Sequence, residues 1–527
     1  MSDAATTKTD PRDLKISEQA KAIAELTKEI ELLKEQNKKL AEHNTQLAEQ
    51  NKKLAKRIER LEALLATKVE SKSSKKPVFT ENYSLGRNKL GKQDSDKKPP
   101  KKSTGRKPAK AKEHLVSDTI EVFPLGVERD QCIHHRFQSA WRIVDGKAVY
   151  LRYDIRDLPD STSLPLPPGV RNSRSEFGME VILILGFLHY WIGVSQENAI
   201  RTMNFFTGLD LSKSQADSLL NQLADDWEQQ HDTIAELIAL QMIVYIDETG
   251  WKVGTTACYT WIFSTAEHVL FRCGVSRKKT EATNVLGDFF NGIGVTDDYV
   301  AYKNLFSEHQ LCWAHLIRKA IKLVLQNPDE TAYVDFLDQL CGIYHDAKEL
   351  RDNVAASVVG EPLNDAAARQ AVVAKLQERI TLLCSRRGEE IITSKAAAKS
   401  EPPIEPTPSH VETFILLQRE LADNVHCLFV FVEHPEVEPT NNRSERNARR
   451  EAEIRKGART SKTDSGAKRR SIIVTVLASL QTRIARFTLS NVLAEVGRWL
   501  DTGKSLFELE LAAIQSKRAP PTKPKPA

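Results

Sequence analysis

Between residues 242 and 325 the chain alternates short apolar segments with turn signals in an order that few folds accommodate. MIVYIDETGWKV predicts a strand, and YTWIFSTAEHVLFRCGVS predicts two more with a turn near Glu267, because both are rich in β-branched and aromatic residues. RKKTEATNVLGDFFNG then predicts a helix, GVTDDYVAY a strand that ends at Asp297, and HQLCWAHLIRKAIKLVL a short strand that runs into a helix. This order indicates an α/β fold.

Three strands, a helix, a strand and a helix in succession are the plan of an RNase H-like domain. The apolar part of the first strand ends at Asp247, and the fourth strand ends at Asp297. The two strands are neighbours in this plan, and active residues of open α/β sheets collect where strands end. We therefore expect Asp247 and Asp297 side by side, with the adjacent Glu248 and Asp298 on opposite faces of their strands.

A third carboxylate, Glu445, lies in PTNNRSERNARR, which predicts the start of a helix. A structural role is open to it, since Asn442 could cap the helix and Glu445 would then occupy the reciprocal position of a capping box. A cap does not require many cations, whereas a phosphate backbone does. The predicted DNA-binding residues on this helix and its exit are Arg443, Arg446, Arg449, Arg450, Arg455, Lys456 and Arg459.

Two aspartates and a distal glutamate are the ligands that a pair of divalent metal ions needs over a phosphodiester. The segment between Asp297 and Glu445 is largely helical in its pattern and then rich in proline. We predict a helical insertion at 326–410. It divides a catalytic domain into parts at 239–325 and 411–502, and a C-terminal tail follows at 503–527.

Near the start of the chain, leucine recurs at every seventh residue from Leu26 to Leu61, with isoleucine or asparagine three positions before each. This spacing is typical of a parallel two-stranded leucine zipper, in which asparagine at the a position fixes the register. A single amphipathic helix packed on its own protein is the alternative. We predict a coiled coil at 14–66 that joins two chains through residues 19–65.

The next segment, 67–117, is rich in Lys, Ser, Gly and Pro and predicts a disordered basic linker. Its residues 68–114 contain 15 Lys or Arg against 5 Asp or Glu. Such an excess of positive charge can bind DNA phosphates without reading sequence. A linker that only solubilises the protein fits the same composition.

Two modules lie between this linker and the first catalytic strand. Residues 118–170 predict a small β-rich module whose QCIHH segment presents Cys132, His134 and His135. A closed zinc site needs four ligands and no second pair follows, so zinc is not expected. Residues 171–238 predict helices capped by Ser195 and Ser212. Both a helix-turn-helix in the DNA major groove and plain helix packing fit that pattern.

Composition limits the class of protein. The net charge of +5 comes from 76 basic and 71 acidic residues, whose uneven placement favours a nucleic-acid partner. Seven scattered cysteines without a CxxC pair indicate reduced thiols and a cytosolic protein. The most apolar run, residues 181–194, is too short to span a bilayer, and the N-terminus lacks the apolar core of a signal peptide. No membrane partner is expected.

Three motifs carry a family resemblance: IDETGWKV, TDDYVAY followed by HQLCWAHLIRKA, and TNNRSERNARREAEIRKGARTSKTDSGAKRRSIIVTVLASL. They resemble the transposases of the insertion sequence 66 family, a bacterial group of DDE transposases, over about residues 115–500. The resemblance implies that Asp247, Asp297 and Glu445 form a catalytic triad. The triad would bind Mg²⁺, or Mn²⁺ in its place, and would cut DNA and join it to a new site.

The resemblance also implies features around the triad. Cys312 and His315 match a C-x-x-H element that related transposases place beside the active site, and Arg318 would join them in supporting it. A buried structural pair fits Cys312 and His315 equally well. Family members usually carry a cysteine-rich zinc-binding segment where this chain has only QCIHH. The implied partners are double-stranded DNA, as transposon ends and target, and small accessory proteins of the same element. The implied location is the bacterial cytoplasm, at the nucleoid.

Two other classes of protein share part of this pattern. A regulator derived from a transposase would bind DNA ends without cutting, and a stand-alone RNase H-like nuclease would cut without joining. The presence of all three carboxylates in a basic setting argues against the regulator. The zipper and the accessory DNA-binding segments, which suit the pairing of two ends, argue against the nuclease.

Overall fold

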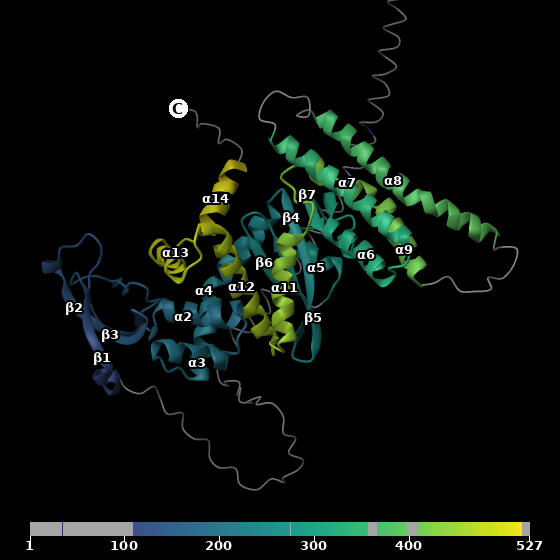
Figure 1. Cartoon of the computed structure of the whole chain (residues 1–527). Helices are drawn as coiled ribbons and strands as arrows, with labels where there is room; N and C mark the ends of the chain where they lie inside the picture. The colour runs from purple at the N-terminus through teal and green to yellow at the C-terminus, as the bar shows by residue number, and fades with distance from the viewer. Residues whose placement is uncertain (1–33, 35–108, 275, 357–365, 398–408, 519–527) are drawn as a thin grey trace, which may run out of the picture. The chain divides into compact units, whose positions relative to one another are not determined.

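The computed structural model describes residues 34, 109–274, 276–356, 366–397 and 409–518. The predicted zipper, apart from Lys34, the linker up to residue 108 and the last nine residues of the tail lie outside this part. The described residues form a mixed α/β structure with two sheets and many helices (Figure 1). Among these residues, no helix combines the length and the apolar character that crossing a membrane requires.

The larger sheet has five strands in the order β6-β5-β4-β7-β8. Their bounds are β4 (Ile243–Val253), β5 (Thr256–Ser264), β6 (Val269–Gly274), β7 (Phe290–Thr296) and β8 (Phe306–Leu311). The first three form an antiparallel meander, and Gly254 allows the tight turn after β4 because its φ is +59°. Helix α5 (Lys279–Leu286) returns the chain to the other side of β4, where β7 and β8 run parallel. The predicted order of strands and helices is confirmed.

The free edge of β6 is covered by helix α12 (Asp464–Arg483), so its backbone groups do not remain open for pairing. Four residues rise about 6 Å along a helix, which matches two residues along a strand. Hydroxyls at this spacing on α12 therefore accept bonds of 2.8–3.2 Å from alternate backbone N–H groups of β6: Ser471 from Cys273, Thr475 from Phe271 and Ser479 from Val269.

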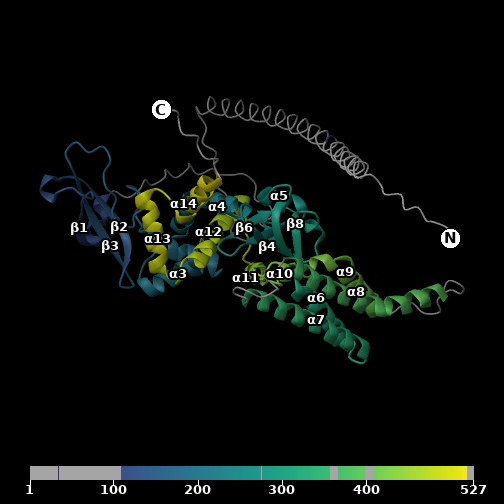
Figure 2. The same cartoon turned by 90° about the horizontal axis from the view of Figure 1, so that it is seen from above.

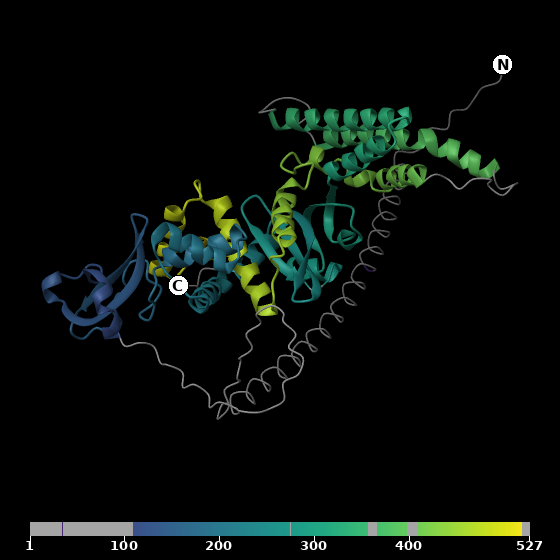
Figure 3. The same ribbon diagram turned by 60° about the horizontal axis from the view of Figure 1, so that its bottom comes forward.

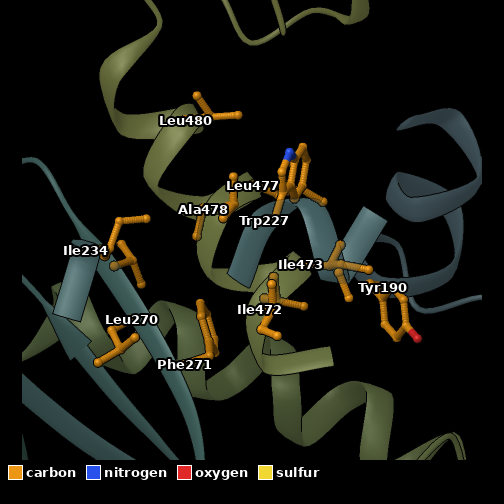
Figure 4. Packing of buried hydrophobic residues seen from close by; sticks show 14 of the residues in the cluster. Tyr190, Trp227, Ile234, Leu270, Phe271, Ile472, Ile473, Leu477, Ala478 and Leu480 are labelled. Carbon is orange, nitrogen blue, oxygen red and sulfur yellow. The ribbon is translucent and has the colours of Figure 1, made fainter. Parts of the chain in front are cut away.

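The largest core lies between β6, α12 and helix α4 (Lys213–Ala239) (Figure 4). Trp227 and Ile234 of α4 pack there against Phe271 and Ile472. The other helices around this core are α2 (Met179–Gly186), its π-helical extension (Phe187–Trp191), α3 (Gln196–Thr207), α13 (Leu489–Thr502) and α14 (Leu506–Arg518). The predicted caps are confirmed: the hydroxyls of Ser195 and Ser212 accept bonds from the first turns of α3 and α4.

A second core lies on the opposite face of the sheet, where Tyr245 and Val295 pack among a group of helices that contact one another. Figure 2 shows several of these helices together at one end of the sheet. These helices are α6 (Trp313–Gln326), α7 (Thr331–Ala356), α8 (Ala366–Ala397), α9 (Ser409–Asp423) and α10 (Val430–Glu433). The helical character expected between Asp297 and Glu445 is thus present in the described residues of this stretch.

A small three-stranded sheet precedes these helices (dark blue in Figure 3). Its order is β1-β3-β2, with β1 (Val116–Val122), β2 (Ile133–Val144) and β3 (Lys147–Asp157). The β2–β3 hairpin turns on Asp145 and Gly146, both at positive φ, as an Asp-Gly hairpin turn requires.

Candidate active site

Asp247 and Asp297 lie at the same level of neighbouring parallel strands. Tyr245 of β4 pairs with Val295 of β7, and each aspartate follows its paired residue by two positions. Asp247 is half-buried within β4, and Asp297 is the first residue after β7. The register of two strands therefore brings together carboxylates that are far apart in the sequence.

Glu445 reaches the same place on helix α11 (Asn442–Lys456). The start of this helix is bound to the backbone just before Asp247: Asn441 Nδ2 donates to the carbonyl of Ile246 at 2.6 Å, and Ser444 Oγ donates to that of Tyr245 at 2.7 Å. Both anchoring side chains are buried. Two buried polar contacts thus fix the start of the helix that carries Glu445.

Electrostatic interactions link the three carboxylates. Burial, together with the neighbouring charges of Glu248, Asp297 and Glu445, raises the pKa of Asp247 to about 8. A hydrogen bond of 2.9 Å from the backbone N–H of Glu248 acts in the opposite direction. Oxygen ligands of like charge around a half-buried aspartate suit a hard divalent cation, which would remove the repulsion between them. These residues therefore suit a divalent cation.

The C-x-x-H element lies beside Glu445, at the start of α6. Arg318 Nη2 donates to both carboxylate oxygens of Glu445, at 2.9 and 3.0 Å, and Cys312 Sγ and His315 Nδ1 lie 3.5 and 3.4 Å from Oε1. The Cys312 sulfur also accepts a bond of 3.1 Å from the backbone N–H of Asn441. Burial raises the pKa of the Cys312 thiol to about 11 and lowers the pKa of His315. Both groups are therefore neutral near pH 7 and hold the Glu445 carboxylate by contact.

The capping box considered for Glu445 is absent. The N-cap is Asn441 rather than Asn442, its side chain makes no capping bond, and Glu445 lies four residues after it. Since Asn441 is buried and bonded to β4, the tertiary contact decides where the helix begins. The side chain of Glu445 makes its contacts with α6 instead of its own helix.

A second buried carboxylate, Glu248, was not predicted as part of the site. Arg277 and the fully buried Tyr302 both bond to it, with 2.5 Å between Arg277 Nη2 and Oε1. Burial raises the pKa of Glu248, and Asp297 contributes to this rise. Tyr299 extends the network, since its ring stacks on Arg277 and its backbone N–H donates to Asp297. These residues come from β4, the loop before α5 and the segment that follows β7, so no single local pattern in the sequence links them.

The seven predicted DNA-binding cations divide into two groups. Four of them hold α11 or its exit to the fold: Arg443 pairs with Glu438, Arg455 donates to Gly250, Arg459 donates to Gly193, and Arg450 stacks on Trp191 at 3.7 Å. Burial lowers the pKa of Arg450 to about 10. The other three, Arg446, Arg449 and Lys456, are exposed and make no ion pair with any described residue.

The QCIHH segment shows no common ligand centre in the described residues. His134 Nδ1 contacts Asp154, His135 Nε2 contacts the carbonyl of Leu158, and Cys132 Sγ donates to the carbonyl of Glu128. Because the three side chains have separate partners, they do not form a group of metal ligands. Clusters of such ligands occur elsewhere in the described chain, and one of them is Cys312, His315 and Glu445.

Comparison with known proteins bears on these motifs. The sequence model of the family described as "Transposase IS66 family" matches residues 196–469, which is more than half of the chain and contains β4, β7 and α11. A search of curated proteins finds no match. The chain belongs to the IS66 family of transposases.

Proposed function

We propose that this protein is a DDE transposase, which cuts DNA strands at the ends of an insertion sequence and joins them to target DNA. The observation that supports this best is the electrostatic interaction of Asp247 with Asp297 and Glu445, which together with burial raises the pKa of Asp247 to about 8. The strand order, with β4 between β5 and β7, supports an RNase H-like domain. In this proposal its two parts are 239–325 and 411–502, and the helices of 326–410 are an insertion.

In the proposed mechanism Asp247, Asp297 and Glu445 hold two Mg²⁺ ions, or Mn²⁺. When bound, the ions would activate a water or a DNA 3′-hydroxyl for attack and stabilise the leaving oxygen. Arg318 orients Glu445 from the exposed side, and Asn441 fixes the start of its helix. Arg277 and Tyr302 bind Glu248, so this carboxylate is already bonded to other residues of the protein.

The remaining regions suit the handling of two DNA ends. The exposed Arg446, Arg449 and Lys456 would contact phosphates near the site. The basic linker and the helices of 171–238 would add DNA contacts. Pairing of two chains through residues 19–65 would hold both ends in one complex, and accessory proteins of the element would assist.

Glu445→Gln tests this proposal, because glutamine keeps the size of the side chain and a bond to Arg318 but removes the charge that holds a cation. We expect strand cleavage in Mg²⁺ to be abolished and binding of the DNA ends to be unchanged. Cleavage is measured on a labelled duplex that carries an end of the element, and binding is measured by gel shift in EDTA.

Glu453→Gln is the matched control, since Glu453 is an exposed carboxylate on the same helix. It should cleave as the wild type does. Cleavage retained by Glu445→Gln would overturn the triad. Binding of ends without any cleavage by the wild-type protein would favour the regulator, and cleavage without joining would favour the stand-alone nuclease.

A further inference from the structure

A polar pocket of about 450 Å³ lies at the opposite end of α11 from Glu445. It is lined by the start of α3, the tip of the β4–β5 hairpin and the loop that joins α11 to α12. None of the three carboxylates of the candidate active site contributes to its lining. The pocket is therefore a separate feature of the family domain.

The loop between α11 and α12 is held firmly to the hairpin. The backbone N–H of Gly254 donates to the carbonyl of Ser461 at 2.9 Å, and Trp251 Nε1 donates to the Ser461 hydroxyl at 3.2 Å. Ala458 has a φ of +57°, a conformation that alanine rarely adopts and that the surrounding bonds must maintain. A fixed loop can present charged side chains in a constant position.

The charges that line this pocket are mostly positive. Arg469 is paired with Asp217, and Arg470 is paired with Glu451. Arg459 bonds only to a backbone carbonyl, at 2.6 Å, and the exposed Lys462 has no ion-pair partner within the described residues. Two cations thus lack a carboxylate partner in a pocket that contains a single acidic side chain.

The backbone around the pocket adds to this charge. Helices α3 and α12 both begin at its edge, with Ser195 and Thr463 as their N-caps. Helix N-termini present free N–H groups and a partial positive charge, which favour phosphate oxygens. The hydroxyls of Thr460 and Ser461 provide further donors. Cations, hydroxyls and two helix starts in one hollow suit a phosphate group.

We propose that this pocket binds a backbone phosphate of the DNA on which the carboxylates act, an inference that rests on the proposed function. Glu445 and Lys456 are 11 residues apart on α11, a rise of about 16 Å. Successive base pairs rise about 3.4 Å, so a duplex that runs along α11 would place the bound phosphate roughly five base pairs from the cleaved bond. Such a contact sets the position of the duplex without reading its sequence.

The test compares salt dependence of DNA binding by the full-length protein in EDTA, with a 40-base-pair duplex of arbitrary sequence as the probe. Replacing Arg459 and Lys462 together by alanine should weaken binding about tenfold and reduce the slope of log K against log salt by about one, because one phosphate contact is lost. Lys504→Ala with Lys517→Ala is the matched control, because it removes two exposed cations, one from the loop between α13 and α14 and one from α14, and should leave both values unchanged.

Because Arg459 also bonds to Gly193, the single variant Lys462→Glu provides a second test that leaves the loop contacts intact. It should reduce the slope by about one or more. Wild-type affinity and slope in both variants would overturn the proposal. It would also be overturned if inorganic phosphate protected the wild type, but not Lys462→Glu, from thermal unfolding while DNA binding of the two proteins stayed equal.

This test does not depend on catalysis. If the variants have reduced slopes and the wild-type protein never cleaves DNA in Mg²⁺, the proposed function is overturned and the phosphate pocket is still supported. Normal slopes together with normal cleavage would overturn the pocket alone.

Discussion

Two carboxylates of helix α11, Glu445 and Glu451, lie six residues apart, and their surroundings differ in charge. Glu451 is buried and forms a bidentate pair with the buried Arg470, at 2.7 and 3.1 Å. Glu445 is half-buried, its arginine partner is exposed, and its charge contributes to the raised pKa of Asp247. A carboxylate that only supports the fold is thus matched by an equal charge. The carboxylates at the strand ends keep an excess of negative charge, which a cation can bind.

Asp247→Asn should have the largest effect on activity and little effect on stability. We expect cleavage in Mg²⁺ to fall roughly 10³-fold or more, because a metal ligand is lost. The melting temperature in EDTA should stay the same or rise, because the change removes repulsion from Asp297 and Glu445. A melting temperature several degrees lower would show that Asp247 supports the fold.

Glu451→Gln should give the opposite result. It leaves the buried guanidinium of Arg470 without a balancing charge, which costs about 3–5 kcal/mol of unfolding free energy. Urea unfolding measures this change, and Glu453→Gln on the exposed face should alter the free energy by less than about 0.5 kcal/mol. Similar values for the two variants would remove the contrast between the buried pair and the strand-end site.

A change of pH distinguishes the strand-end carboxylates from the Glu451–Arg470 pair while the fold stays the same. The pKa of Asp247 is raised to about 8 in the folded protein, above its unfolded value of about 3.9. The folded state therefore holds a proton that the unfolded state has lost, and the metal-free protein becomes less stable as pH rises from 6 to 8.

Melting temperatures in EDTA at pH 6, 7 and 8 measure this predicted loss of stability. The decrease should be smaller in Asp247→Asn than in the wild type, and Mg²⁺ should offset it most at pH 8. Equal decreases in the two proteins would mean that Asp247 does not titrate in this range.

Arg318→Ala should have the smallest effect on stability. The Arg318 side chain is about half exposed, at 52%, and its pair with Glu445 is screened by solvent. We expect a loss of less than about 1 kcal/mol in the same urea experiment. A loss as large as that of Glu451→Gln would show that the pair beside the active site supports the fold as strongly as the buried one.

The sequence allowed the strands that carry Asp247 and Asp297 to be predicted, because strands follow from local patterns. The choice of these two residues over the adjacent Glu248 and Asp298 came from the family motifs. Apolar segments gave the strands, and the order of strands and helices placed β4 beside β7. Capping by Ser195 and Ser212 was predictable for the same reason, since a cap depends on its own helix.

The surroundings of α11 could not be predicted in this way. Its sequence is highly charged and suggests a helix in water, yet Arg450 stacks between Trp191 and Phe271, and Glu451 is buried. Which of many arginines faces inward depends on residues of other elements that lie far away in the sequence. The start of the helix at Asn441 was missed for the same reason, since its bond to Ile246 spans 195 positions.

That bond also has a consequence during synthesis. Glu445 follows Asp297 by 148 residues, which a ribosome adds in roughly 7–30 s at about 5–20 residues per second. Until α11 is made, the strands carrying both aspartates have no third carboxylate and no Asn441 to fix its place. Under the proposed function, chains that end before α11 would therefore leave DNA uncut, and the ability to cut would arise only after this helix has been made.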